Sequence, residues 1–529
     1  MLQKTEDKSL KDQINQDNAR VIIVGAGFGG LATAMILSSK GYKVTVLEKL
    51  DVVGGRGSSR FQDGHRFDLG PTILTVPKVF EELWERCGAE FQDHVKIKKL
   101  DPYYNIVFQD KTCLRISDSM EDFEKQISDI SPKDLNGYRR FMDLSRRQYE
   151  FAFSKKGKMG RSSMHNFWNT LKVFPTFARL RADRSVYQSV ASYVSDSRLR
   201  FAMSFHPLFV GGDPFNVTSM WGLVNYLEHK FGVHYVSGGA QAMADAMASK
   251  ICSDGGQVKL NHSVKRILTS GSKAIGVELS SGQKLHSDIV ISNADIGHTY
   301  NNLLEGKRKK RWTEKKLNKK NWSMSLFVWH FGTKKTKEKW KHVNHHTILV
   351  GPNYRKEVSD IFIQGHIPDE MSLYVHRPSV TDNSVAPEGD DTFYVLACVP
   401  HLGFENAPDW NVYKDKYKSK VLSMLEKKLM PGLGKTIKTE FIMTPIDFRD
   451  RYLSSYGSGF SIEPRMFQSA WFRPHNKSEE LTNFYLVGAG THPGPGMPGV
   501  IASAEILDEI IPSAKEFQLV NEPSYSKIK

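Results

Sequence analysis

Long apolar runs are missing from this chain of 529 residues. No stretch approaches the roughly eighteen apolar residues that a bilayer-spanning helix requires, so any membrane contact is expected to be peripheral. Residues 1–19 are polar and lack the apolar segment of a secretory signal. We expect them to be a frayed leader before the first strand.

Cysteine is also scarce, and the four cysteines stand far apart: Cys87, Cys113, Cys252 and Cys398. No C-x-x-C pair and no His-rich spacing indicates a disulfide framework or a metal site. We therefore expect no metal ligands, and ordinary buried thiols in a reducing compartment such as the cytoplasm.

Negative charge is in deficit, with 58 Asp and Glu against 73 Lys and Arg and a formal net charge of +15 at pH 7. Such an excess predicts an anionic partner, either nucleic acid or a membrane surface. No helix-turn-helix, zinc-finger or RNP motif is present, which favours the membrane and predicts no nucleic-acid partner. A positive surface that only keeps the protein soluble is an equally open interpretation.

What the chain does have is a buried strand that turns sharply into a helix near its N-terminus. Residues 21–24 form an apolar, β-branched run typical of a parallel strand covered on both faces. Three glycines follow at the G-x-G-x-x-G spacing of a dinucleotide-binding turn: Gly25, Gly27 and Gly30. The helix amides near Phe28 and Gly29 would then face a pyrophosphate.

A second predicted strand, residues 43–48, ends in an acid eighteen residues after Gly30. At that distance Glu48, with Lys49 beside it, is expected to reach a ribose. Gly54, Gly55 and Arg56 come shortly afterwards, where the glycines let the backbone pass a ligand and the arginine can meet a phosphate. This arrangement favours FAD over NAD, although a surface ion pair is the alternative for Arg56 taken alone.

The chain returns to this fold twice. Residues 257–267 and 274–279 are predicted strands, and Val264 is a candidate for backbone contact with adenine, or else a plain edge-strand residue. Residues 483–491 again combine a strand with a glycine turn at Gly490, and Met497 precedes a helix predicted over 501–511. The helix N-terminus there is expected to approach the flavin. The sequence thus predicts an α/β protein whose Rossmann-like FAD-binding domain is split in sequence.

The middle of the chain is richer in apolar and aromatic residues. Residues 164–174 have the apolar spacing of a short amphipathic helix, and basic residues precede it at 155–161. Such a helix could lie at a membrane interface or pack inside a helical lobe. The apolar and aromatic run at 220–227 could form the wall of an apolar cavity or part of an ordinary hydrophobic core. His206 is either a weak catalytic candidate or a buried histidine whose hydrogen bonds are satisfied within the fold. The basic run at 306–320 predicts either an anionic-lipid contact or a solvated face.

We therefore expect a second, substrate domain with a mixed sheet and a helical lobe that faces the membrane. The expected organisation in chain order is a leader at 1–19, the first FAD-binding part at 20–130, the helical lobe and substrate entrance at 131–234, the second FAD-binding part at 235–300, the substrate domain at 301–440, and the third FAD-binding part with a C-terminal tail at 441–529.

Several segments together resemble the bacterial and fungal type of phytoene desaturase. Besides the N-terminal turn they are residues 54–56, 68–72, 206–212, 345–347, 394–396, 399–403, 469–476 and 487–494. The likeness extends from about residue 20 to about residue 510. The nucleotide motifs are shared with amine oxidases and many carotenoid enzymes, whereas the middle segments are more specific.

The resemblance implies an FAD enzyme that removes hydrogen from phytoene, a linear C40 polyene, in successive steps towards neurosporene or lycopene. It implies an apolar substrate drawn from a membrane, with oxygen or a quinone as the final electron acceptor. Within the same fold, a C30 diapophytoene desaturase, a later-step carotenoid desaturase and a carotene isomerase stay open. A non-catalytic flavin- or lipid-binding protein is the alternative from another class, and an amine oxidase is less favoured because no aromatic cage for an amine is evident.

Overall fold

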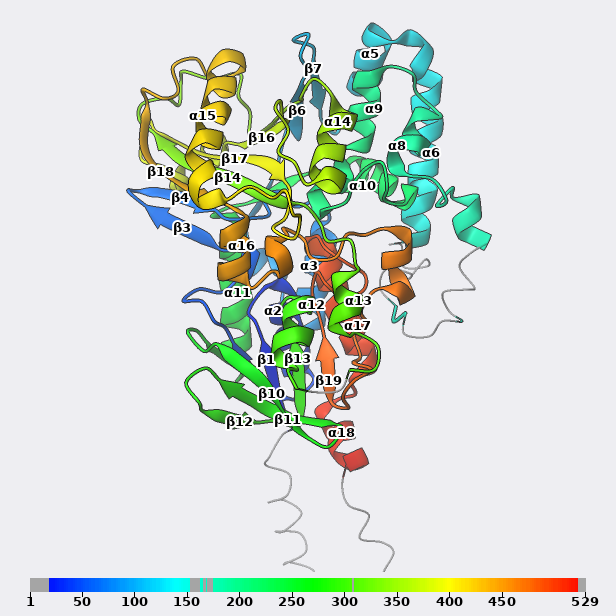
Figure 1. Ribbon diagram of the computed structural model, residues 1–529, viewed down its shortest axis with the longest axis vertical. Coiled ribbons are helices and arrows are strands. Elements are labelled where there is room, and N and C mark those ends of the chain that lie inside the picture. Colours follow the sequence, from blue (N-terminus) through cyan, green and yellow to red (C-terminus); the bar gives the residue numbers. More distant parts are fainter. Residues whose placement is uncertain (1–18, 153–161, 165–167, 169–174, 307–308, 522–529) are drawn as a thin grey trace, which may run out of the picture.

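Two sheets organise the computed structural model, which describes residues 19–152, 162–164, 168, 175–306 and 309–521. The first sheet has five parallel strands in the order β19-β13-β1-β2-β9 (Figure 1). Their bounds, in that order, are Phe484–Leu486, Ile289–Ser292, Arg20–Val24, Lys43–Leu47 and Gln257–Lys259. The strands come from three distant parts of the chain, so the predicted split of this sheet in sequence is confirmed.

Different layers cover the two faces of the parallel sheet. Val21 and Ile23 of β1 pack in one apolar cluster with the helices, whereas Ile22 and Val24 pack in another. The helical layer consists of α2 (Phe28–Ser39), α11 (Gly239–Ser253) and α17 (Met497–Ile510). The opposite layer is an antiparallel sheet of β10 (Val264–Ser270), β11 (Lys273–Leu279) and β12 (Lys284–His286). This double cover is why β1 is a continuous apolar run.

The second sheet is mixed and has seven strands in the order β18-β14-β17-β16-β15-β6-β7. Their bounds, in that order, are Ile437–Met443, Ser325–Thr333, Asp391–Val399, Leu373–His376, His346–Leu349, Tyr104–Val107 and Cys113–Ile116. Only the β15–β6 pair is parallel. Phe327 and Trp329 pack towards α15 (Trp410–Lys428) on one face, and Leu326 and Val328 lie in the cluster on the other.

A group of helices packs beside the second sheet (Figure 1). It contains α5 (Met120–Ile130), α6 (Leu135–Ala152), α8 (Val186–Ala191), α9 (Ser197–Ser204), η4 (His206–Val210), η5 (Ser219–Gly222) and α10 (Leu223–Phe231). The apolar faces of α5, α8, α9 and part of α6 join the same cluster as the inner face of the sheet, whereas Leu223 and Leu227 of α10 belong to the cluster of the parallel sheet. The residues of the predicted amphipathic helix at 164–174 lie outside the described residues, apart from Met164 and the exposed Trp168.

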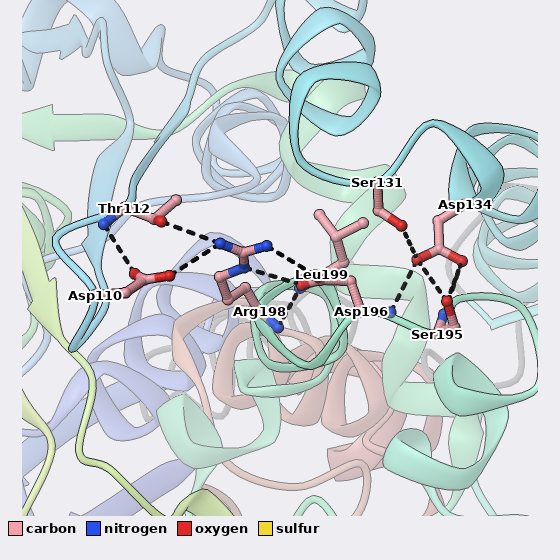
Figure 2. A network of polar contacts seen from close by, with 8 residues as sticks. All are labelled: Asp110, Thr112, Ser131, Asp134, Ser195, Asp196, Arg198 and Leu199. Atoms are coloured by element: carbon pink, nitrogen blue, oxygen red, sulfur yellow. Dashed lines mark hydrogen bonds and ion pairs between the residues drawn. The ribbon is translucent and has the colours of Figure 1, made fainter.

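A polar network around the buried Asp134 holds the turn before α9 in place (Figure 2). The Asp134 carboxylate accepts hydrogen bonds from the backbone amides of Ser195 at 2.8 Å and Asp196 at 2.9 Å. Burial alone would raise the pKa of the Asp134 carboxyl, but the hydrogen bonds from these amides and from the Ser131 and Ser195 hydroxyls together hold the pKa below its usual value. Asp196 in turn caps α9, and Arg198 donates to Asp110 at 2.9 Å, which joins the helices to the loop between β6 and β7.

The remaining elements are two small two-stranded sheets, short helices and single turns. They are β3 (Ser59–Gln62), β4 (His65–Asp68), α3 (Pro77–Arg86), α4 (Phe91–His94), β5 (Ile97–Lys99), β8 (His234–Val236), α12 (Ile296–His298), α13 (Glu314–Asn318), α14 (Tyr354–Ser359), α16 (Pro445–Tyr452) and α18 (Ala514–Asn521), together with the single turns η1 (Gly55–Gly57), η2 (Pro132–Asp134), η6 (Thr299–Leu303), η7 (Asp360–Gln364), η8 (Pro378–Val380), η9 (Asn383–Val385), η10 (Ser455–Gly457), η11 (Met466–Gln468) and η12 (Ala470–Phe472).

Two predicted elements have the wrong bounds. The single strand predicted over 257–267 is two strands, because Asn261 takes a left-handed conformation (φ 57°) and its amide donates to the Leu50 carbonyl at 2.9 Å. The helix predicted from residue 501 begins at Met497, because Pro498 fits the first turn of a helix and needs no amide partner there.

The prediction of four buried thiols is wrong for two of them. Cys113 lies on β7 at the edge of the seven-stranded sheet, and Cys252 lies in the last turn of α11; both are exposed. Cys87 is buried and Cys398 is partly buried.

The predicted domain bounds stay a prediction, but strands from outside 301–440 complete the second sheet. β6 and β7, from within 20–130, pair at one edge, and β18 extends past residue 440 at the other. No helix among the described residues is long and apolar enough to cross a membrane.

Candidate active site

A cavity of about 480 Å³ is lined by residues of both sheets and of the helices beside them. This volume lies within the range of ligand-binding cavities. All of the predicted site residues line it except Gly30 and Gly490. The sites predicted at the two ends of the chain and in its middle are therefore parts of one cavity.

The turn between β1 and α2 leaves a free helix N-terminus in this cavity. Gly25 has φ 96°, which side chains other than glycine rarely adopt. A Cβ on Gly27 would lie 2.9 Å from Nδ2 of Asn293, and Gly27 caps α2 without any side-chain hydrogen bond. No acidic residue lies in the first turn of α2. The backbone and amides near Phe28 and Gly29 therefore suit an anion.

Gly30 has a packing role instead of a lining role. A Cβ on it would lie 2.1 Å from the carbonyl oxygen of Gly25, so only glycine lets the helix come this close to the turn. Gly490 resembles it, since a Cβ there would lie 2.7 Å from Cβ of Ile296. Both residues shape the turns around the cavity without lining it.

Glu48 is buried at the end of β2 and holds two backbone amides. Oε2 accepts from Ala26 at 2.7 Å and Oε1 from Leu50 at 2.9 Å. Each oxygen retains a lone pair, which is free for a ligand hydroxyl. The ammonium of Lys49 is instead engaged by protein, because Nζ donates to the carbonyl of Asp450 at 2.6 Å.

Arg56 is a half-buried cation whose buried Nε is a free donor. Its Nη2 donates to Oγ of Ser454 at 2.5 Å, and Nε has no partner among the described residues. Burial lowers the pKa of the Arg56 guanidinium, while the Asp295 carboxylate opposes this shift. A buried donor without a partner, next to a glycine turn, fits an anionic or polar group of a cofactor.

A second helix N-terminus opens into the same cavity. Met497 starts α17, which Gly496 caps with φ 97° and no side-chain hydrogen bond. Val264 starts β10 and also lines the cavity, where it stays a candidate for backbone contact. Two free helix N-termini, those of α2 and α17, thus open into one cavity.

His206 belongs to a buried polar group in the cavity wall. Its Nε2 lies 3.1 Å from the Tyr104 hydroxyl and 3.3 Å from Oε2 of Glu228. The Tyr104 hydroxyl donates to the same oxygen at 2.6 Å. Burial raises the pKa of Tyr104 well above its usual value, so the tyrosine is neutral.

Apolar side chains make up most of the remaining wall. They come from η4, η5, α10 and the inner face of the seven-stranded sheet, and include Phe209, Trp221, Leu223, Leu227, Ile348 and Leu396. Trp221, Leu223 and Leu227 belong to the aromatic run at 220–227, so the interpretation of that run as a cavity wall is supported. Such a wall excludes water and suits an apolar ligand.

Sequence reasoning did not single out several polar residues of the cavity as site residues, among them Thr72, Glu228, Glu357 and Tyr374. Of these four, only Thr72 lies in a segment that carries the resemblance, residues 68–72. Glu357 lies in α14, and burial raises the pKa of its carboxyl to about 7. Its neighbours in sequence include Arg355, Lys356 and Asp360, so nothing local marks this acid as buried.

Comparisons with known proteins agree with this geometry. The family model described as "Flavin containing amine oxidoreductase" matches residues 28–506. The neurosporene-forming phytoene desaturase of Rhodobacter capsulatus is 54% identical over 94% of this chain and 94% of its own length. That of Cereibacter sphaeroides is 52% identical over 96% of this chain and 97% of its own length.

The chain belongs to the phytoene desaturases. Like the other members of the wider flavin-containing family, it is a flavin oxidoreductase, and flavin is its cofactor. The free helix N-termini, the glycine turn and the unpartnered Nε of Arg56 fit such a group.

Solved structures share the fold of this phytoene desaturase. An oxidoreductase from Methanosarcina mazei has a TM-score of 0.62 at 18% identity and covers 93% of this chain and 100% of its own. Wild-type putrescine oxidase bound to putrescine has a TM-score of 0.59 at 16% identity, covering 93% of this chain and 98% of its own. Identities this low show the fold alone.

Proposed function

We propose that this phytoene desaturase binds FAD and removes hydrogen from phytoene in successive steps, with neurosporene as its product. The relatives at 52–54% identity are neurosporene-forming, whereas those from Paracoccus and Pantoea at 41% are lycopene-forming. The closer identity to the first group supports neurosporene.

The observation that carries the proposal is the continuity of the cavity. The same cavity has Gly27, Glu48 and Arg56 at its polar part and Trp221, Ile348 and Leu396 in its apolar wall. A dinucleotide and a long hydrocarbon can therefore meet inside the protein. This would not be expected of an enzyme for a small charged amine.

Each predicted cofactor residue has a role in this proposal. The amides of the turn formed by Gly25, Gly27, Phe28 and Gly29 bind the pyrophosphate, and the free lone pairs of Glu48 accept from ribose hydroxyls. Gly55 permits close approach, and Arg56 supplies a charged donor. Val264 contacts the adenine through its backbone, and the N-terminus of α17 at Met497 faces the flavin. Gly30 and Gly490 contribute through packing, and Lys49 by anchoring the chain at Asp450.

The bound flavin supplies the acceptor for a hydride from a carbon beside a double bond. The protein holds the polyene in place, keeps water out and takes up the proton released from the neighbouring carbon. Water exclusion matters because a carbocation beside a polyene would otherwise be trapped by water. His206 stays a candidate for a polar group that faces the substrate.

Phytoene is an apolar molecule, so we further propose a peripheral position on the cytoplasmic side of a membrane. The exposed lysines of the basic run, Lys310, Lys315 and Lys319, support contact with anionic lipid. Other cations of that run are engaged in the fold: the Lys316 ammonium lies 4.7 Å from the centre of the Trp312 ring. Oxygen or a quinone is proposed as the final electron acceptor.

Expression in cells that make phytoene but lack desaturases tests the proposal. Chromatography of the pigments should show neurosporene as the main product. Lycopene would contradict the proposed number of steps, and colourless cells with phytoene intact would contradict the activity. Supplying the C30 precursor instead tests the diapophytoene alternative, which the 31% identity to a Methylomonas enzyme makes worth including.

A further inference from the structure

One acidic residue borders both the large cavity and a second, much smaller one. Among the described residues, Glu228 is the only one that lines both cavities. It lies in α10, and Leu223 and Leu227 of the same helix form part of the apolar wall. Glu228 is only 3% exposed. A carboxyl group is therefore held in a wall that is mostly apolar.

Two side chains hold one oxygen of this carboxyl group and leave the other free. Oε2 accepts a 2.6 Å hydrogen bond from the Tyr104 hydroxyl, and Nε2 of His206 lies 3.3 Å from the same oxygen. Burial raises the pKa of Tyr104 well above its usual value and the charge of Glu228 adds to the shift, so the tyrosine keeps its proton and donates it. Oε1 has no hydrogen-bond partner among the described residues.

The Glu228 carboxylate lacks a permanent cationic partner. No lysine or arginine in the described part of the chain forms an ion pair with it, and its ion-pair contact is Nε2 of His206. Burying a carboxylate without a paired cation is costly, so such a group calls for a functional explanation. A cation that arises in the cavity only during the reaction would supply the missing charge.

The elements that carry this group pack against the N-terminus of α17, where the flavin is proposed to lie. A Cβ on Gly496, which caps α17, would lie 3.3 Å from Cγ1 of Val210 in η4, and η4 begins with His206. The apolar face of α10 packs in the same cluster as Met497. Glu228 and His206 therefore belong to the part of the cavity wall nearest the proposed site of hydride transfer.

We propose that Glu228 is the catalytic residue that stabilises the cation formed by hydride loss and then takes the proton. The assignment rests on the proposed desaturation. A C–H bond beside a double bond breaks, and its electron pair leaves as hydride for the flavin, so the carbon becomes cationic. The C–H bond of the neighbouring carbon then breaks; its electrons form the new double bond, and its proton passes to Oε1 of Glu228.

A fixed negative charge in an apolar cavity suits both tasks. In a low-dielectric site a preorganised charge stabilises a developing opposite charge far more than it does in water. A carboxylate with one free oxygen is also a sufficient base, because a proton next to a carbocation is strongly acidic. Tyr104 and His206 are positioning residues, since they hold Oε2 and leave Oε1 to react.

The smaller cavity gives the proton a way out. It has a volume of about 20 Å³, enough for one water molecule, and Tyr103, Tyr138, Asn225 and His229 also line it. His229 is partly exposed. A proton on Glu228 can therefore leave through a water in this cavity without crossing the apolar one, and Glu228 is again a carboxylate for the next step.

Two substitutions of Glu228 separate charge from shape. Glu228→Gln keeps the size of the side chain and removes the charge, whereas Glu228→Asp keeps the charge on a shorter side chain. Each FAD-loaded protein is mixed anaerobically with phytoene in lipid vesicles, and the rate of flavin bleaching is followed. Glu228→Gln should be slower than wild type by about 10²-fold, as expected when a group that stabilises transition-state charge is lost. Glu228→Asp should be faster than Glu228→Gln.

The order of the two variants decides between a charged role and a packing role. Glutamine fills the space of glutamate better than aspartate does, so bleaching in Glu228→Gln that equals or exceeds that in Glu228→Asp would overturn the assignment. Glu278→Gln is the matched control, because Glu278 is 8% exposed but lies on β11, outside both cavities, and it should keep the wild-type rate. If wild type itself forms no product from phytoene, the proposed function fails and the assignment falls with it.

Ligand binding to the flavin-free protein gives a readout that does not depend on turnover. One probe is a linear polyprenyl chain with a tertiary ammonium group in place of one carbon, and the other is the same chain with carbon at that position. The ratio of the dissociation constant of the neutral probe to that of the cationic probe should fall at least about tenfold from wild type to Glu228→Gln, because the charged probe resembles the cation of the reaction. An unchanged ratio contradicts the proposed counter-charge even where the rates differ.

Discussion

The backbone amide of Ala26 donates a 2.7 Å hydrogen bond to Oε2 of Glu48, which ties the turn after β1 to the end of β2. The other oxygen accepts from Leu50 at 2.9 Å, and the residue is only 7% exposed. The acid predicted to bind a ribose therefore also shapes the loop that approaches the pyrophosphate. One side chain couples two parts of the cofactor site.

Glu48→Gln tests that coupling. The glutamine amide replaces one acceptor oxygen with a donor, so one backbone amide loses its partner, and a hydrogen bond to a charged group contributes about 1.5–3 kcal/mol. FAD affinity should fall at least about tenfold, since about 1.4 kcal/mol corresponds to that factor. Titration of the flavin-free protein with FAD measures this change. Glu85→Gln, on the exposed side of α3, is the control, and equal dissociation constants for both variants would contradict the role.

Gly27→Val should abolish FAD retention. Its Cβ would lie 2.9 Å from Nδ2 of Asn293, and its methyl groups would occupy the space in front of the α2 amides. The purified variant should be colourless while its circular dichroism spectrum stays that of wild type. Gly434→Val is the matched change, because a Cβ at this exposed position meets its neighbours at an ordinary 3.5 Å. A yellow and active Gly27→Val protein would show that the turn does not hold the phosphates.

Glu357 predicts a specific pH dependence of stability. Burial raises the pKa of its carboxyl from 4.5 to about 7, so the folded protein binds more protons than the unfolded chain between these values. Its contribution to stability is present below about pH 4.5 and is lost as the pH rises to about 7. Glu357→Gln removes this contribution. As the pH rises, the free energy of unfolding of the variant should therefore fall less steeply than that of wild type, and the two slopes should differ by up to about 1.4 kcal/mol per pH unit.

Urea unfolding of wild type and Glu357→Gln at several pH values between 4.5 and 7 measures the difference. Glu463, whose pKa burial also raises to about 7, contributes equally in both proteins and cancels. Parallel pH profiles would contradict the assignment to Glu357.

Membrane contact is tested by replacing the exposed lysines of the basic run, Lys310, Lys315 and Lys319, with glutamine. Binding to vesicles that contain anionic lipid should weaken, and the loss should be larger at low salt, where charges are less screened. The control replaces the exposed Lys265, Lys273 and Lys284 of the three-stranded sheet, which removes the same charge. Equal cosedimentation of the two triple variants would assign the run to a solvated surface.

Local patterns in the sequence were enough to predict the cofactor half of the molecule. The run from Val21 to Val24, the spaced glycines and Glu48 lie within one βαβ unit, so their spacing along the chain largely determines their positions in space. The same reasoning failed at Gly490, where strand, turn and helix recur but the glycine packs against Ile296 instead of lining the cavity. A motif predicts the turn, not which of its atoms faces the ligand.

The substrate half was harder to predict because its contacts are long-range. Tyr104 and Glu228 meet across 124 residues and Thr72 and Tyr374 across 302, and no local spacing records such pairs. The β6–β7 hairpin lies within residues 20–130, so it was predicted to belong to the first FAD-binding part. In the structure it joins the second sheet through the parallel pairing of β6 with β15. The sequence signal available for this half was the presence of isolated polar residues in apolar strands, such as Tyr374 and His376.

The most direct test of the account is an anaerobic titration of the purified, FAD-loaded protein with phytoene in lipid vesicles. We predict that the flavin absorbance bleaches while the absorbance of a conjugated polyene appears, with one new double bond for each flavin reduced. A flavin that stays oxidised, with phytoene recovered unchanged, would contradict the claim that cofactor and polyene meet in this cavity.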